Sequence, residues 1–410
     1  MGILSRLFFG KRGTATVPDR ETLAAWVRDG YDHQVRGNIE EAQRLFHAVL
    51  EHDPRHPDVL FFLGASAAND RRELEAVHFL EKAVDARPED GKFNFTLASV
   101  LHEMGRFEEA VPYFRNAVRL QPDHPDATGM LWAALLETSY RGGQRREEEL
   151  RVEVEKARDS GKADIYSDIL LAAIYRNQGR IDDSIAASRR LLQRVPDHSD
   201  TYSDLLLTMN YSEAYGPDEL FAEHERYAAR FARPYVAPPV DRTWPRRLRV
   251  GYVSPDFRSH VVALFFEPIV ELHDRDRFEV FCYYNHRRND DFTARCRAAA
   301  DHWLDCVHLS DAELADRIRA DRIDILVDLA GHTGFNRLKV FAMKPAPVQV
   351  TYLGYPNTTG LAAIDYRITD ARVDPPGVAD RMSAEKLVRM PDGFHCFRPR
   401  PDSPEVGPLP

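Results

Sequence analysis

Two histidines stand in short polar segments, and each segment follows an apolar run. His260 ends the segment VSPDFRSH, and His332 lies in GHTG directly after the run IDILVDLA. An imidazole titrates near neutral pH, so a histidine in such a segment can transfer a proton or hold a substrate hydroxyl. Asp256, four residues before His260, can orient its ring or can equally cap a following helix. Each histidine can also be only a hydrogen-bonded polar residue, and GHTG only a turn that needs glycine.

A third polar segment, GYPNTTG, begins with Gly354, Tyr355 and Pro356. All three segments fall where short apolar runs alternate with helical patterns. The predicted strands are residues 248–253, 278–284, 302–307, 323–330, 348–353 and 366–369. The predicted helices are residues 261–272, 290–300, 311–320 and 336–342. This alternation indicates a parallel, Rossmann-like sheet, in which the polar segments meet at the carboxyl ends of the strands, where ligands bind.

The first half of the chain carries an internal repeat of 34 residues, the interval that separates Pro54, Pro88 and Pro122. Small residues recur in register at Gly30, Gly64 and Ala98 and at Ala42, Ala76 and Ala110, and large apolar residues recur at Phe46, Leu80 and Phe114. The period and the positions are those of tetratricopeptide repeats, in which small residues let two helices approach closely and proline ends the second helix.

The repeat becomes irregular in the middle of the chain. Residues 141–161 are highly charged, which indicates an insertion or a longer repeat with a solvated helix face. The pattern then returns, with Ser184 and Ser188 where alanine and phenylalanine are expected. The sequence therefore predicts at least one degenerate repeat before the α/β region.

A proline-rich stretch, residues 234–245, separates the two halves and follows a predicted helix over residues 219–231 that Asp218 caps. We therefore predict an α + α/β fold, in which an N-terminal α-solenoid of tetratricopeptide repeats precedes a Rossmann-like α/β lobe. The predicted parts are an N-terminal extension (1–20), the solenoid with its bridging helices (21–235), the lobe (246–400) and a linker or tail (401–410).

Composition and charge argue against several classes of protein. The net charge is −10 and no basic stripe is present, which disfavours nucleic-acid binding. The four cysteines form no CxxC pair, so we expect free thiols and no metal site. The first residues, MGILSRLFFGKR, are too short for a secretory signal or a membrane span. We therefore expect a cytoplasmic protein that does not enter a membrane.

Four segments together resemble the O-linked N-acetylglucosamine transferase family of the SPINDLY type (glycosyltransferase family 41): VSPDFRSH, DILVDLAGHTG, PAPVQVTYLGYPNTTG and EKLVRMP. The segment LLLTMNYSEAYGPDELFAEH is similar to that family's junction between repeats and catalytic region. The resemblance implies an enzyme that transfers a sugar from a nucleotide donor, UDP-N-acetylglucosamine, to Ser or Thr of proteins. It also implies that no metal and no cofactor take part, and that acceptor proteins or peptides bind the concave face of the repeats.

Carried over by position, His260 matches the family's histidine beside the sugar and the acceptor hydroxyl. Gly354, Tyr355 and Pro356 match the loop that lines the sugar pocket. We therefore take His260 as the candidate catalytic residue, acting as a base or as an orienting group. The candidate substrate-binding residues are Gly354, Tyr355, Pro356, His332 and Asp256.

The sequence departs from the family at Asn357, where glycine is usual, and at Val261 and Phe335. Asparagine tolerates positive φ, so we expect the turn to persist while the side chain narrows the sugar pocket. Asp328 is a second carboxylate that can orient a ligand.

Alternatives to a complete enzyme remain open at this point. The family's catalytic region has two Rossmann-like lobes, and this sequence resembles only the first, which faces the acceptor and the sugar. One alternative is a non-catalytic tetratricopeptide scaffold. Another is a truncated or split half that needs a second nucleotide-binding lobe on another chain. The donor sugar also stays open, because related proteins use N-acetylglucosamine, fucose or glucose.

Overall fold

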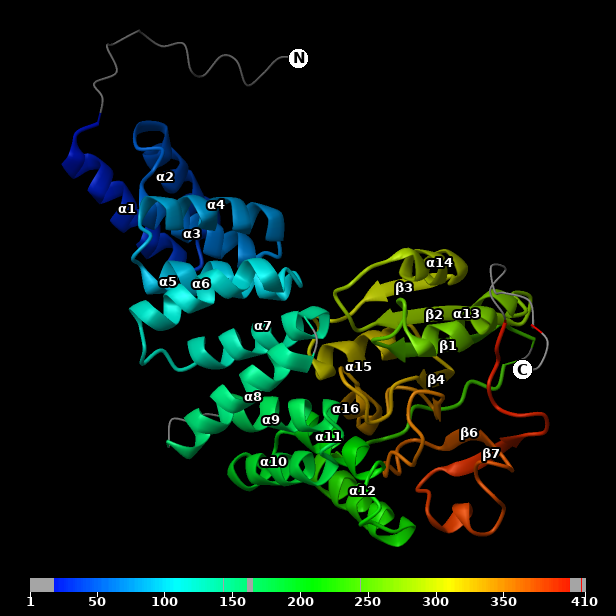
Figure 1. Cartoon of the computed structure of the whole chain (residues 1–410). Coiled ribbons are helices and arrows are strands. Elements are labelled where there is room, and N and C mark those ends of the chain that lie inside the picture. Colours follow the sequence, from blue (N-terminus) through cyan, green and yellow to red (C-terminus); the bar gives the residue numbers. More distant parts are fainter. Residues whose placement is uncertain (1–17, 143, 161–164, 244, 399–406, 408–410) are drawn as a thin grey trace. The chain divides into compact units, whose positions relative to one another are not determined.

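The computed structural model describes residues 18–142, 144–160, 165–243, 245–398 and 407. The chain divides into two compact units, Met1–Lys156 and Ala157–Pro410. The described part of the first unit is helical, whereas the second combines helices with a seven-stranded sheet (Figure 1). This arrangement confirms the predicted α + α/β fold class.

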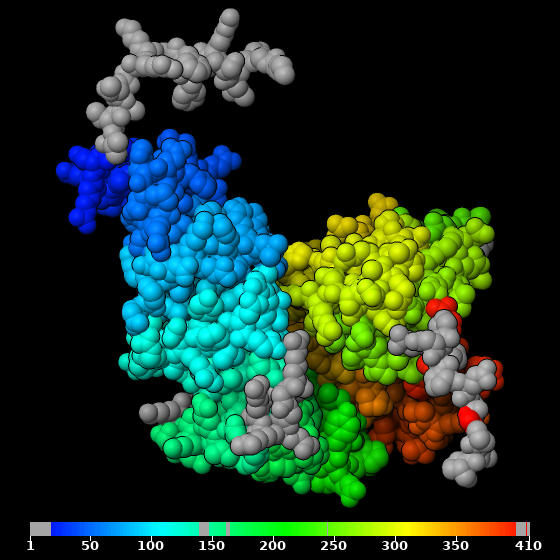
Figure 2. All heavy atoms as spheres, turned by 45° about the horizontal axis from the view of Figure 1, so that its top comes forward, coloured from blue at the N-terminus to red at the C-terminus, as the bar shows by residue number. Residues whose placement is uncertain are grey.

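The first unit consists of antiparallel helix pairs that follow one another in chain order (Figure 1), and Figure 2 shows the same order as a succession of colours from blue to cyan. Its helices are α1 (Arg20–Val35), α2 (Ile39–His52), α3 (Pro57–Asn69), α4 (Glu73–Ala86), α5 (Gly91–Glu103), α6 (Phe107–Leu120) and α7 (Ala127–Gly142), and α8 (Gln144–Asp159) crosses into the second unit. A Cβ atom at Gly30 would lie 2.6 Å from the Phe46 ring, and one at Gly64 would lie 2.6 Å from Leu80. The repeat register is therefore explained by close packing of small residues against large ones.

Helix α8 lies within the charged residues 141–161, which we predicted to be an insertion or a longer repeat. Its Leu150 and Val154 are buried, and Glu153 accepts a hydrogen bond of 2.9 Å from Nε1 of Trp132 on α7. The charged segment is thus helical, and it buries Glu147 as well as Leu150 and Val154, so only part of its charges lies on a solvated face.

The second unit begins with four more helices: α9 (Ile165–Asn177), α10 (Ile181–Arg194), α11 (Ser199–Met209) and α12 (Pro217–Phe231). Ser184 is buried where the repeat expects alanine, and its hydroxyl donates to the Ala172 carbonyl at 2.7 Å, so the polar atom is satisfied. The prediction that Asp218 caps α12 is wrong. The helix begins two residues earlier than expected, with Gly216 as N-cap and Glu219 accepting from its N–H, because Pro217 suits the first helical position.

The sheet is parallel throughout, in the order β3-β2-β1-β4-β5-β6-β7. Its strands are β1 (Leu248–Ser254), β2 (Phe278–Tyr284), β3 (His302–Asp305), β4 (Ile325–Asp328), β5 (Val348–Tyr352), β6 (Tyr366–Asp370) and β7 (Lys386–Met390). The helices between them are α13 (Val261–Leu272), α14 (Asp291–Ala299), α15 (Asp311–Ala320) and α16 (Leu338–Ala342), and a 3₁₀ turn, η1 (Ala379–Arg381), precedes β7. Strand β7 was not predicted, because this edge strand buries only Leu387 fully.

Two apolar cores lie on opposite faces of the sheet, since successive side chains of a strand point to opposite sides. Phe266 of α13 belongs to one core. Tyr227 and Phe231 of α12 share the other core with Ile318 of α15 and Phe341 of α16. The last helices before the proline-rich stretch are therefore packed into the lobe. The two compact units divide between Lys156 and Ala157, before these helices. The domain boundary that we placed at residues 234–245 remains a prediction.

Candidate active site

The strand order creates a switch point between β1 and β4. The chain runs outward from β1 through β2 to β3, then returns to place β4 on the other side of β1. The carboxyl ends of the strands at such a point leave a crevice where ligands bind in open α/β sheets. The polar segments after β1, β2, β4 and β5 all lie at this edge, which we call the carboxyl edge.

His260 is the N-cap of α13, and its Nδ1 accepts a hydrogen bond from the Val262 N–H at 3.3 Å. The same nitrogen lies 3.5 Å from Oδ1 of Asp256, and the His260 side chain is 35% exposed. Nε2 has no hydrogen-bond partner among the described residues, so this atom can contact a ligand. Burial lowers the pKa of His260, although the Asp256 charge opposes this, so the ring is neutral at neutral pH.

Asp256 is buried, and its carboxylate contacts both Nη2 of Arg258, at 3.3 Å, and His260. Burial raises the pKa of Asp256, while the charges of His260 and Arg258 lower it. The alternative that Asp256 caps the following helix is wrong, because His260 occupies that position. The geometry supports the alternative that Asp256 orients the His260 ring.

Three further residues at the carboxyl edge were not singled out from the sequence as candidates for the site. Arg258 lies beside Asp256 and His260. His286 follows β2, and its pKa is lowered to about 4 by burial and by the charges of Arg258, Arg288 and His260. The exposed Phe335 ring meets His286 edge-on, with centroids 5.3 Å apart, and Asn285 holds the Phe335 carbonyl at 2.7 Å. His286 could have been found from the sequence, because it directly follows a predicted strand. The strand order that brings β2 next to β1 is not visible in the sequence.

His332 lies at the carboxyl edge but points into the protein. It is fully buried, and its Nε2 donates to the Thr359 carbonyl at 3.0 Å, which leaves Nδ1 to accept from the Ser203 hydroxyl of α11 at 3.0 Å. Burial holds its pKa well below the usual range. Gly331 has φ of +54° in the same turn. These contacts favour the structural alternative for His332 and argue against the predicted ligand contact.

Tyr355 also turns inward, onto α11 and α12. Nδ1 of His224 donates to the Leu220 carbonyl at 2.6 Å, so its Nε2 accepts from the Tyr355 hydroxyl at 2.8 Å. Nδ2 of Asn210 donates to the same hydroxyl at 2.8 Å, and Oδ1 of Asn210 accepts from Asn357 at 3.0 Å. Asn357 is absent from the positive-φ residues, so our explanation by positive φ is wrong. Its side chain instead donates to Asn210, the C-cap residue of α11.

The remaining predicted residues have distinct positions. A Cβ atom at Gly354 would lie 2.0 Å from the Leu329 carbonyl oxygen, so glycine is required where the β5 and β4 loops cross. Pro356 is exposed at the tip of its loop. Asp328 is buried and accepts from the Ala330 and Gly331 N–H groups, and burial raises its pKa to about 6. Asp328 therefore shapes the turn after β4.

Among the described residues, no group of three or more His, Cys, Asp or Glu side chains is placed to hold a metal ion. No helix in the same part of the chain is long and apolar enough to cross a membrane.

Comparison with known proteins indicates the families that the chain resembles. Residues 224–398 match the model of glycosyl transferase family 41, and residues 28–91 and 91–124 match tetratricopeptide repeat models. A solved structure titled as a mutant O-GlcNAc transferase of Thermobaculum terrenum is 31% identical, with a TM-score of 0.50, and the match covers 96% of this chain and 62% of that one.

Plant relatives match about half of the chain. The protein named probable UDP-N-acetylglucosamine–peptide N-acetylglucosaminyltransferase SPINDLY is 40% identical in Arabidopsis thaliana over 225 residues, which is 52% of this chain and 24% of that protein. The protein of the same name from Oryza sativa subsp. japonica is 37% identical over 236 residues, or 55% and 25%. The chain thus spans about a quarter of the length of these relatives.

Proposed function

We propose that this chain, whose residues 224–398 match the model of glycosyl transferase family 41 and follow residues that match tetratricopeptide repeat models, forms the acceptor side of a protein O-glycosyltransferase. The donor is a nucleotide sugar, UDP-N-acetylglucosamine, and the acceptor is a Ser or Thr hydroxyl of a protein. The observation that carries the proposal is the half-buried, neutral His260 at the switch point, with a buried carboxylate on its Nδ1 side and a free Nε2.

Two hydrogen-bonding states of His260 give it two roles. When Nδ1 accepts from Val262, as the 3.3 Å contact indicates, the proton is on Nε2, which donates to the sugar or to the acceptor oxygen. When Nδ1 carries the proton and faces Asp256, 3.5 Å away, Nε2 can accept the proton of the acceptor hydroxyl. The shorter contact favours the donor state, so we assign His260 an orienting role before the acceptor is bound.

Helices α11 and α12 position the loops of this site. Hydrogen bonds with Ser203, Asn210 and His224 attach the segments after β4 and β5 to these helices. Pro356 and Phe335 of the same segments are exposed to solvent. The exposed Phe335 ring offers an apolar face on which a sugar or an acceptor side chain can pack. We propose that the loops of the lobe shape the site and that the repeats bring the acceptor protein to it.

We also propose a cytoplasmic location, which the free thiols support. Cys282, Cys296 and Cys306 are free and buried, which suits a reducing environment, and we place the protein in the cytoplasm.

The test is transfer of labelled sugar from UDP-N-acetylglucosamine to a Ser-containing peptide. The assay contains the protein with a nucleotide-binding lobe, either on the same polypeptide or added as a second chain. We expect label on the peptide and none on its Ser→Ala counterpart. A lack of transfer, while the repeats still bind the peptide, would support the non-catalytic scaffold instead.

A further inference from the structure

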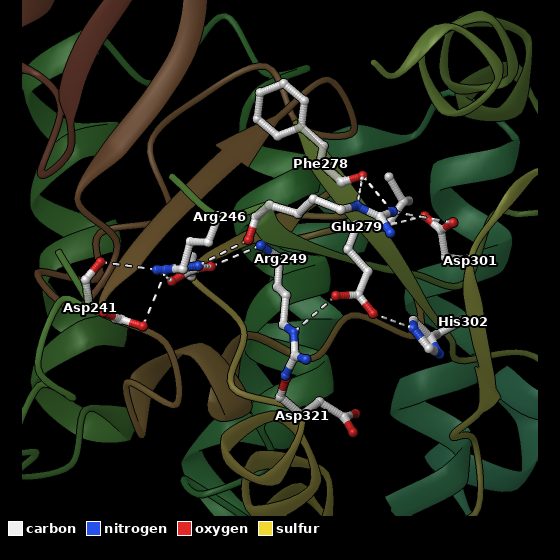
Figure 3. Close-up of polar contacts among 11 residues, drawn as sticks. Asp241, Arg246, Arg249, Phe278, Glu279, Asp301, His302 and Asp321 are labelled. Atoms are coloured by element: carbon white, nitrogen blue, oxygen red, sulfur yellow. Dashed lines mark hydrogen bonds and ion pairs between the residues drawn. The ribbon is translucent and has the colours of Figure 1, made fainter. Parts of the chain in front are cut away.

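A cavity of about 670 Å³ lies at the amino edge of the sheet, where the strands begin. It is bounded by the proline-rich stretch and by the residues that lead into β1, β4 and β5. Five arginines line it, namely Arg246, Arg247, Arg249, Arg319 and Arg322, together with the three carboxylates of Asp241, Glu279 and Asp324. We call this the arginine cavity, and Figure 3 shows the contacts of Arg246 and Arg249 in it. The lining therefore carries a formal surplus of two positive charges.

Asp324 and Glu279 are each shared between two donor groups. Asp324 accepts two hydrogen bonds from Arg246, at 2.6 and 2.7 Å, and one from the backbone N–H of Arg249 at 2.8 Å. Glu279 accepts from Nε of Arg249 at 3.1 Å and contacts Nε2 of His302 at 2.7 Å (Figure 3). Both carboxylates are therefore already paired with donors of the protein, and each would have to be shared further to neutralise another guanidinium group.

Several guanidinium donors have no protein acceptor. The Arg322 side chain makes no hydrogen bond and no ion pair within 4 Å among the described residues, although its charge acts on Asp241. Nη2 of Arg249 and Nη1 of Arg247 donate no hydrogen bond in the same set, and Arg247 contacts Asp301 through Nη2 at 3.6 Å. Guanidinium groups pair with phosphate oxygens through parallel hydrogen bonds. The cavity thus offers donors that an anion can use without breaking an existing pair.

Arg322 occupies a position where glycine is usual. It follows the end of α15 with φ of +53°, a left-handed conformation that costs free energy for a residue with a Cβ atom. Arg71 has φ of +60° at the corresponding position after α3, and it is not among the lining residues of the cavity. The two residues make a matched pair, because Gly relieves the same strain in both.

We propose that the arginine cavity binds the phosphate or diphosphate group of a small organic molecule. The volume lies within the range of about 300–1,000 Å³ that small-molecule sites occupy. Pro238, Pro239, Ile323, Pro345 and Pro347 supply an apolar wall for the rest of the ligand. No aromatic ring is among the lining residues, so a base-stacking nucleic acid fits less well. The seven-residue β1 separates this site from His260 by roughly 20 Å.

Titration of the 410-residue chain with sodium pyrophosphate, at ionic strength held constant with sodium chloride, tests the proposal by calorimetry. We expect saturable binding that Arg322→Gly weakens at least tenfold, because charge-assisted hydrogen bonds are lost. The midpoint of thermal unfolding without ligand should stay equal or rise in this variant, since the backbone strain is relieved. Arg71→Gly should change that midpoint in the same direction and leave the affinity unchanged.

The proposal would be overturned by the absence of saturable heat beyond that of chloride, or by equal affinities for the wild type and Arg322→Gly. A second variant, Arg249→Gln, must also weaken binding, because it removes a charge from the same cavity. Loss of binding in Arg71→Gly as large as that in Arg322→Gly would show that the pyrophosphate responds to net charge alone, and would equally contradict a defined site.

Discussion

At the scale of single residues, the neighbours of His260 determine its protonation. Burial lowers its pKa and the Arg258 charge lowers it further, while the Asp256 charge raises it. A neutral imidazole is needed for either proposed role, so activity should persist below the ordinary histidine pKa and fall only at more acidic pH. The pH at which it falls reports on the balance between these charges.

Asp256→Asn should move the acid limb of the activity profile to lower pH. The substitution removes the negative charge that favours the imidazolium form, so the pKa of His260 should fall further. The same shift should appear in an NMR titration of the His260 ring, with His302 as a control, because its partner Glu279 is untouched. An unchanged or higher His260 pKa would contradict the assigned contact.

Residue types indicated His260 and Asp256 from the sequence, but not the direction in which the loop side chains point. His332 and Tyr355 are buried against α11 and α12, and that packing depends on contacts between residues more than 100 positions apart. The position of the Asn357 side chain is likewise explained by its hydrogen bond to Asn210, a contact that no local sequence pattern reveals. Local patterns could therefore locate the loops but could not separate ligand contacts from structural ones.

At the scale of elements, the lobe was largely predictable. The strands and helices between residues 248 and 370 lie close to the predicted ranges, because buried parallel strands are continuous apolar runs. Strand β7 was not predicted because its residues are mostly exposed. The start of α12 was placed two residues too late because Pro217 and Glu219, rather than Asp218, determine it. The strand order followed from neither propensity nor periodicity.

Gly354→Ala tests how tightly the loops after β4 and β5 cross. The new methyl group would meet the Leu329 carbonyl oxygen at 2.0 Å, so we expect the free energy of unfolding to fall by more than about 2 kcal/mol. Gly334→Ala is the control, because a Cβ atom there would have no neighbour within 4 Å. Its effect should stay within about 0.5 kcal/mol in urea unfolding. Equal losses of unfolding free energy in the two variants would contradict the close approach of Gly354 to Leu329.

At the scale of the whole molecule, the last repeat-like helices belong energetically to the lobe. Residues 157–410 should therefore unfold cooperatively as a fragment, since this is one compact unit. A fragment of residues 246–410 should not, because it lacks Tyr227 and Phe231 from the core and leaves His332 and Tyr355 without partners. Circular dichroism during heating distinguishes the two fragments, and a cooperative transition in the shorter one would contradict this account.

The central claim is that His260 serves sugar transfer and not only the helix that it caps. Histidine also caps α3 at His56 and α11 at His198, so capping alone explains nothing about chemistry. Asparagine is among the best N-cap residues, so His260→Asn should keep the cap but lose the imidazole, whereas His260→Ala loses both. Loss of a cap costs about 1 kcal/mol, which predicts a lower thermal midpoint for the alanine variant alone.

The deciding measurement is the rate of labelled sugar transfer by His260→Asn beside the wild type, with thermal midpoints measured on the same samples. We predict a rate at least about 10²-fold lower at an unchanged midpoint, because a positioned acid–base or orienting group contributes that much to the rate. Near-full activity in His260→Asn would show that the residue is only a helix cap, and that the active site has been assigned to the wrong side chain.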